Sequence, residues 1–158
     1  MARKTATVIV ELEGRDQGKV FLLTEMSAAM AEKWALRMFI ALKGSGSEIS
    51  EEMARLGMVG VGLAGLNVFL RADIDPKVLE PLLDEMLTCV KRVRDPKRPD
   101  LATPISAEID IEEVPTLLWL RSEVIRLHTN FSPADAMSRL ISLATMLPSS
   151  TTSTSPLQ

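Results

Sequence analysis

The sequence predicts an α+β fold in which helices dominate: an N-terminal β-hairpin or small sheet packed with about five α-helices. β-branched residues alternate with other types over residues 5–12, and later segments repeat apolar residues at the three- and four-residue spacing of helices. The 158 residues suffice to bury one core. We expect a single domain over residues 1–147 with a flexible loop at 95–104, and a disordered tail at 148–158 that is low in complexity.

Two short apolar segments near the N-terminus predict the β element. Residues 5–12 and residues 20–24 are separated by the polar sequence EGRDQGK, which is typical of a turn. The two segments should pair as a hairpin.

The first helix should begin after Ser27, a good N-cap, and run to Lys43, where Gly44 and the following SGS favour a stop. Apolar residues occupy most of its circumference, so we expect a central helix or one that binds a partner. Its main interior charges form only a narrow polar stripe: Glu32, Lys33 and Arg37.

Residues 50–71 have a helical pattern that contains four glycines, each costing about 1 kcal/mol relative to alanine in a helix interior. Either another helix approaches closely across the small residues, or the helix is loose or broken. The uncharged stretch at 56–70 is shorter than the roughly 20 residues that a membrane-spanning helix needs, so no span is predicted.

A clear start signal follows, with Asp75 as N-cap and Pro76 at the first helical position. The pattern predicts a helix that continues to Val93. The three prolines within 95–104 indicate a loop or linker.

Residues 110–130 predict a helix with one regular apolar face. Trp119 falls on the opposite, polar side, where it is either an exposed interface anchor or is covered by the prolyl loop or the hairpin. A last helix is expected over 132–146. The apolar face of the 110–130 helix comprises Leu117, Leu120, Val124, Leu127 and Phe131.

The search for a catalytic or cofactor site finds only weak candidates. Gly60, Gly62 and Gly65 satisfy GxGxxG, but a dinucleotide site needs a preceding strand and a βαβ unit, and here a helix comes first. His128, the only histidine, lies on the apolar arc of its helix and should be a hydrogen-bonded core imidazole.

Paired carboxylates are also poor candidates for acid–base or metal chemistry. Asp84 with Glu85, and Glu112 with Glu113, are adjacent on helical segments and therefore point in different directions. The sequence predicts a protein that is not an enzyme, with no catalytic residue, no cofactor and no metal.

Charge and cysteine content argue against further classes of function. A net charge of −3 with dispersed Lys and Arg disfavours a nucleic-acid partner. The only cysteine, Cys89, excludes an intrachain disulfide and suits a reducing cytoplasm, where it should be a buried small hydrophobe. No signal peptide is recognisable, so export is not indicated.

Nine methionines, four phenylalanines and no tyrosine indicate an aliphatic composition. Methionine adapts to irregular packing and recurs on surfaces that accept several partners, although a helical core with many methionines explains the same numbers. Periodicity selects four partner-binding candidates, and excess apolar surface suggests a possible homo-oligomer. The candidates are Met30, Trp34, Met38 and Trp119.

Three blocks occur in an order that resembles one family of tail assembly chaperones of long-tailed bacteriophages: GRDQGKVFLLTEMSAAMAEKWALRMFIAL, PLLDEMLTCVKRV and DIEEVPTLLWLRSEVIRLHTNFSPADA. They fall within residues 14–136. The resemblance implies a non-enzymatic protein that binds the tape-measure protein and helps recruit tail-tube subunits around it. It supplies no catalytic residues.

The resemblance also implies location in the cytoplasm of the infected bacterial host and absence from the mature virion. Some such chaperones have a frameshifted longer form, for which the tail after Pro148 is a reasonable junction, although a plain terminus fits equally. The alternative function is a structural head–tail connector or tail component retained in the virion. A small membrane-active phage protein that uses residues 56–70 is a further rival.

Overall fold

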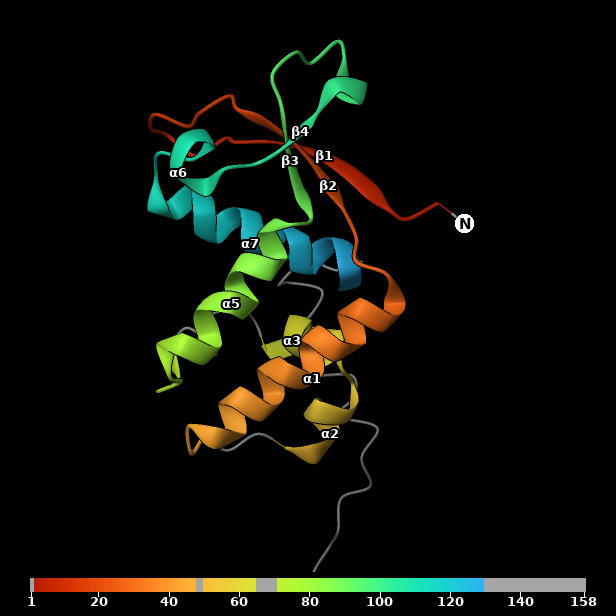
Figure 1. The fold of residues 1–158 in the computed structure, drawn as a ribbon, viewed down its shortest axis with the longest axis vertical. Helices are drawn as coiled ribbons and strands as arrows, with labels where there is room; N and C mark the ends of the chain where they lie inside the picture. The colour runs from red at the N-terminus through yellow and green to blue at the C-terminus, as the bar shows by residue number, and fades with distance from the viewer. Residues whose placement is uncertain (1, 48–49, 65–70, 130–158) are drawn as a thin grey trace, which may run out of the picture.

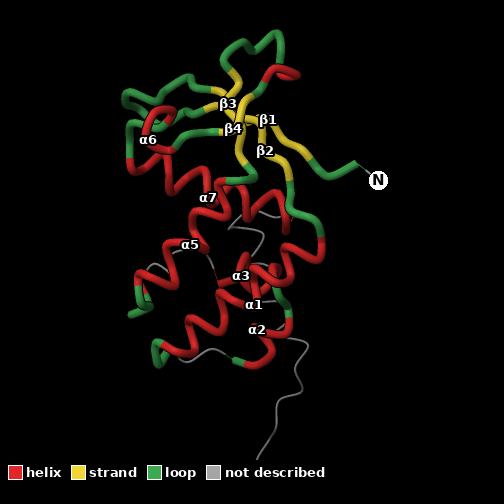
Figure 2. The backbone as a smooth tube through the Cα atoms, in the orientation of Figure 1, coloured by secondary structure: helices red, strands yellow, loops and turns green. Residues whose placement is uncertain are grey.

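The computed structural model describes residues 2–47, 50–64 and 71–129, and within them the predicted α+β fold with dominant helices is confirmed. A sheet lies at one end of the molecule, and α1, α2, α3 and α5 form the other end, with α7 between them (Figure 1; Figure 2). The elements in chain order are β1 (Thr5–Ile9), β2 (Val20–Thr24), α1 (Ala28–Gly44), α2 (Glu51–Arg55), α3 (Met58–Ala64), α5 (Pro76–Leu87), β3 (Val90–Val93), the 3-10 helix η1 (Pro99–Leu101), β4 (Thr103–Pro104), α6 (Ala107–Asp110) and α7 (Val114–Thr129).

The predicted N-terminal hairpin is present, because β1 and β2 pair antiparallel with Val8 opposite Phe21. The turn is closed by backbone hydrogen bonds between Val10 and both Gly18 and Lys19. Gly18 has a φ of +80°, a left-handed conformation that glycine adopts without strain. The hairpin forms half of a four-stranded antiparallel sheet of order β1-β2-β3-β4.

One prediction about the middle of the chain is wrong. The helix expected to reach Val93 ends at Leu87, and the following VKRV segment forms β3 beside β2, so the strands are not confined to the N-terminus. Val90 and Val93 are both buried. Pairing with the exposed edge of the hairpin satisfies the backbone groups of β2 and buries two β-branched side chains, which outweighs local helical preference.

The prolyl segment 95–104 connects β3 to β4 and contains η1 and the two residues of β4. Lys91 lies opposite Pro104 in the sheet. The segment is therefore a hairpin connection within the sheet, as Figure 1 shows at the end of the molecule remote from α1.

Helix α1 begins and ends close to the predicted residues. The Ser27 side chain accepts a hydrogen bond from the Met30 N–H, and Ser45 is the C-cap. One face of α1 is fully buried, and the indole Nε1 of Trp34 donates to the Leu82 carbonyl oxygen of α5 at 2.8 Å. The buried residues of this face are Ala31, Trp34, Ala35, Met38, Phe39 and Leu42.

The glycine-rich segment is both broken and closely packed. Gly57, with a φ of +56°, separates α2 from α3. A Cβ added at Gly60 would lie 2.1 Å from the Met53 carbonyl oxygen, and one at Gly62 would lie 2.7 Å from Cγ2 of Thr129 in α7. Both alternatives predicted for this segment therefore apply within 50–64. Residues 65–70 lie outside the described part of the chain.

Helices α5 and α7 complete the core. The Asp75 carboxylate accepts from the Lys77 N–H at the start of α5, with Pro76 at the first helical position as predicted. In α7 the predicted apolar residues Leu120 and Val124 are buried, and Leu117 and Leu127 pack against the core. Phe131, the expected last helix and the tail lie outside the described residues.

Glycine substitutions test the close packing of α3. Gly60→Ala should lower the free energy of unfolding by about 1–3 kcal/mol, because the new methyl group overlaps a backbone oxygen that cannot rotate away. Gly44→Ala is the matched control: nothing lies within 4 Å of its added Cβ, so it should be neutral or stabilising by up to about 1 kcal/mol. Urea denaturation measures both, and equal effects would contradict the packing described.

Candidate partner-binding surface

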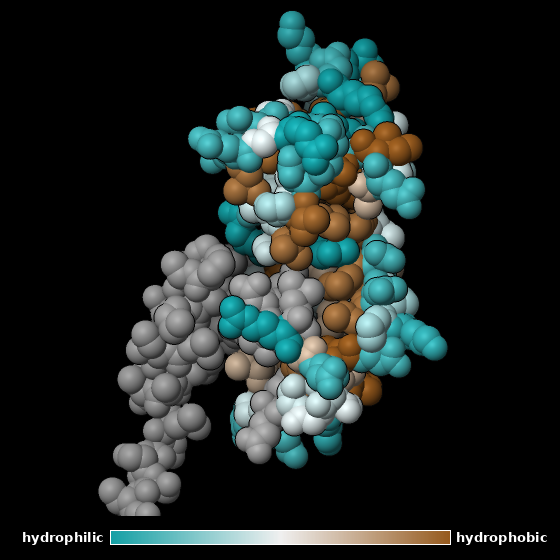
Figure 3. Space-filling model, turned by 90° about the vertical axis from the view of Figure 1, so that its left-hand side faces the viewer, coloured by the Kyte–Doolittle hydropathy of each residue, from teal (hydrophilic) through white to brown (hydrophobic). Residues whose placement is uncertain are grey.

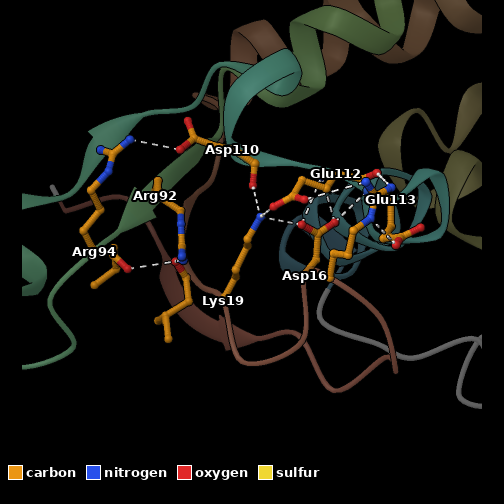
Figure 4. A network of polar contacts seen from close by, with 10 residues as sticks. Asp16, Lys19, Arg92, Arg94, Asp110, Glu112 and Glu113 are labelled. Atoms are coloured by element: carbon orange, nitrogen blue, oxygen red, sulfur yellow. Dashed lines mark hydrogen bonds and ion pairs between the residues drawn. The ribbon is translucent and has the colours of Figure 1, made fainter.

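A network of polar contacts joins the β1–β2 turn to the start of α7 (Figure 4). The buried Asp16 carboxylate accepts from the backbone N–H groups of Glu112 and Glu113 at 2.8–3.0 Å and from Lys19 Nζ at 2.6 Å. Lys19 also reaches Glu112 Oε1 at 3.0 Å, and Arg15 Nε donates to Glu113 at 2.9 Å. Asp16 thus holds the two residues that precede α7 from a distant part of the sequence.

The electrostatics of this cluster are those of a structural clamp. Burial alone would raise the pKa of Asp16, but the hydrogen bonds from Lys19 and from the backbone of Glu112 and Glu113 outweigh it and lower the pKa to about 2. The carboxylate therefore stays ionised and engaged. No group of three or more potential ligands among the described residues could hold a metal ion. The cluster fixes α7 on the hairpin and offers no free acid or base.

His128 is likewise satisfied by the fold. Its Nε2 accepts from the Met26 N–H at 2.8 Å, so its Nδ1–H donates to the Val124 carbonyl oxygen at 2.7 Å. The hydrogen bonds agree with the prediction, and the side chain is partly buried at the edge of the core. Gly60 and Gly62 lie inside α3, a helix, as expected for a GxGxxG match outside a dinucleotide site.

The four predicted partner-binding residues do not form one surface. Trp34 and Met38 are fully buried, so their assignment to a binding surface is corrected: they are core residues of α1. Met30, on the same helix, is 43% exposed. Trp119 is partly buried against the core and lines a groove whose other wall is β1.

The structure presents instead an exposed apolar ridge on α1, formed by Leu36 and Ile40, which are 58% and 62% exposed. On one side of the ridge a groove of about 590 Å³ separates α1 from α5, and Val78, 47% exposed, lies on its far wall. On the other side a groove of about 750 Å³ separates α1 from α2. Ile40 lines both grooves.

Charged groups border this surface. Arg37, at the edge of the α1–α5 groove, forms an ion pair with Glu85 at 2.7 Å. Lys43 and Glu51 line the α1–α2 groove. Figure 3, which views the molecule from the side of α5 and the C-terminal end of α1, shows hydrophobic groups in a strip with hydrophilic groups along one side. An apolar centre with a charged rim is the usual anatomy of a protein-binding surface.

Sequence reasoning missed Leu36 and Ile40 because it treated α1 as apolar almost all round. At about 100° per residue, both side chains project from the side of Glu32 and Lys33, opposite the Trp34 face. Two large aliphatic residues inside the polar arc of a helix were the available signal.

No family model, curated protein or solved structure matches this chain. Within the described residues, none of the helices has the length and apolar character needed to cross a membrane.

The Asp16 clamp predicts a specific pH dependence. Because its folded pKa of about 2 lies below the ordinary value of 3.8, the stabilisation is complete above pH 5 and is lost as the pH falls through 3.8 toward 2. Asp16→Asn should lower the free energy of unfolding by about 2 kcal/mol at pH 7 and by much less at pH 2.5. Urea denaturation at both pH values measures this, with Asp73→Asn as the control; an equal loss at both would contradict the clamp.

The two faces of α1 should respond differently to truncation. Met38→Ala should lower the free energy of unfolding by about 2–5 kcal/mol, because it opens a cavity in the core. Leu36→Ala, on the exposed ridge of the same helix, should change it by no more than about 0.5 kcal/mol. Thermal and urea unfolding of both variants test the orientation of α1, which would be wrong if the order of the effects were reversed.

Proposed function

We propose that this chain is a tail assembly chaperone of a long-tailed bacteriophage, which binds the tape-measure protein and helps recruit tail-tube subunits around it. The protein acts without catalysis, in the cytoplasm of the infected bacterial host, and is left out of the mature virion. The observation that carries the proposal is the Leu36–Ile40 ridge with a groove on each side. It supports a binding role on chemical grounds that are separate from the resemblance in sequence.

The shape and chemistry of the ridge suit an apolar helical partner. A tape-measure chain is expected to be largely helical, and an amphipathic helix binds by placing its apolar side chains into a groove between other helices. The two grooves lie on either side of α1 and share Ile40. A partner helix in either groove would bury the ridge, which a solvated helix otherwise leaves exposed.

Electrostatics set the expected specificity. The rims carry both signs of charge, with Arg37 and Lys43 on α1 and Asp73, Asp75 and Glu51 on the opposite walls. A partner with charges of both signs flanking an apolar stripe would match them. Mixed rims of this kind contribute more to orientation than to affinity.

The proposal is tested by co-expressing the chain with the tape-measure and tail-tube proteins encoded beside its gene. The chain should co-purify with the tape-measure protein and increase the fraction of it that remains soluble. Leu36→Ser with Ile40→Ser should reduce recovery by at least about tenfold, because two exposed anchors are lost. The matched control, Ile109→Ser with Val114→Ser, removes side chains that are 75% and 69% exposed elsewhere and should leave recovery unchanged.

Purified virions should lack the chain. Failure to capture the tape-measure protein, together with stoichiometric presence of the chain in virions, would contradict the proposal and favour the structural connector. If both double variants lost capture equally, the binding would be nonspecific hydrophobic association. The Leu36–Ile40 ridge would then not be the binding surface.

A further inference from the structure

The outer edge of β1 is the clearest feature that the proposed function leaves unused. Among the residues that the structure describes, β1 is the first strand of the sheet and pairs only with β2. The Lys4 carbonyl oxygen accepts from Glu25, and Val10 bonds with Lys19 and Gly18, so the even-numbered residues direct their backbone groups toward β2. Strand alternation then points the N–H and C=O groups of Thr5, Thr7 and Ile9 away from the sheet.

Nothing in the side chains of this edge opposes the approach of another strand. Thr5, Thr7 and Ile9 are all exposed, and the strand itself carries no charge. A groove of about 580 Å³ between β1 and α7, with Trp119 on its far wall, leaves space beside the strand. Natural edge strands usually carry a charge, a proline or a bulge that prevents such pairing.

The sequence around β1 is complementary to itself. In an antiparallel pair centred on Thr7, each Thr7 faces its equivalent, Thr5 faces Ile9 of the other strand, and Arg3 faces Glu11. This is the register in which every outward-pointing backbone group finds a partner. Arg3 and Glu11 are both exposed, and the two-fold axis makes their attraction occur twice.

We propose that the edge of β1 pairs with β1 of a second copy of this chain, joining two four-stranded sheets into one continuous eight-stranded sheet across a two-fold axis. The charge pattern selects this occupant: an arbitrary extended segment would leave Arg3 and Glu11 without opposite partners, whereas a second copy supplies both. The surface is distinct from the ridge on α1, so the two can be occupied at once. The dimer therefore presents two separate sets of ridge and grooves.

Sedimentation equilibrium of the full chain over a range of concentrations tests the pairing. Thr7→Pro removes an outward N–H that β2 does not use, so it should leave the monomer folded and weaken the dimer by at least about tenfold. Thr7→Val, which keeps the N–H, is the matched control and should dimerise normally. Circular dichroism and urea unfolding of Thr7→Pro check that its fold is retained.

Charge reversal tests the register. Arg3→Glu alone and Glu11→Arg alone should each weaken the dimer about tenfold, because two attractions become two repulsions, and the combined variant should recover to within about threefold of the reference chain. Leu36→Ser with Ile40→Ser should leave the dimer unchanged. This separates failure of the pairing from failure of the proposed function.

The pairing would be overturned if the reference chain remained monomeric or if its dimer were insensitive to Thr7→Pro. It would also be overturned if the combined Arg3→Glu and Glu11→Arg variant dimerised no better than either single variant. Capture of an extended peptide by a monomeric chain at this edge would likewise replace the second copy as occupant. A dimer lost in Thr7→Pro and recovered in the combined charge variant is the result expected.

Discussion

Enclosure of the Trp34 face of α1 is the constraint on which the rest of the structure depends. The indole is completely buried and its Nε1 donates to the backbone of α5, so α1 has one available orientation against its neighbours. Burying a side chain of this size is worth several kcal/mol, and leaving its N–H unpaired would cost more. The opposite side of α1 must then face outward, although it carries Leu36 and Ile40.

The exposed ridge is thus a consequence of the way α1 is held. A helix with large apolar residues on both sides can bury only one of them in a domain of this size, unless a second layer of structure covers the other. The buried side is satisfied by α3 and α5, and the ridge lies between two grooves. Aliphatic and small side chains line most of both grooves, and charged side chains lie at their edges. The proposed binding role rests on this arrangement.

Much of the fold was predictable from local signals, because those signals act over a few residues. Ser27 and Asp75 cap helices as expected, and the hairpin follows from two short apolar segments around a polar turn. The β3 segment was not predictable, since VKRV continues a helical pattern and becomes a strand only because β2 offers it an edge. The Asp16 clamp was also hidden, because it joins residues 96 and 97 positions apart in the chain. The periodicity of α1 predicted a central helix or one that binds a partner, and two of the residues it selected as binding candidates, Trp34 and Met38, lie on the buried face.

The central claim is that the ridge of α1, and not another exposed surface, contacts the tape-measure protein. Site-specific photo-crosslinking in the co-expressed complex tests it most directly, with a photoreactive residue placed at Ile40, at Val78 or, as a control, at Ile109, which is 75% exposed at the sheet end of the molecule. The account predicts covalent adducts with the tape-measure protein from Ile40 and Val78 and none from Ile109. Adducts from Ile109 alone, or equal adducts from all three positions, would contradict it.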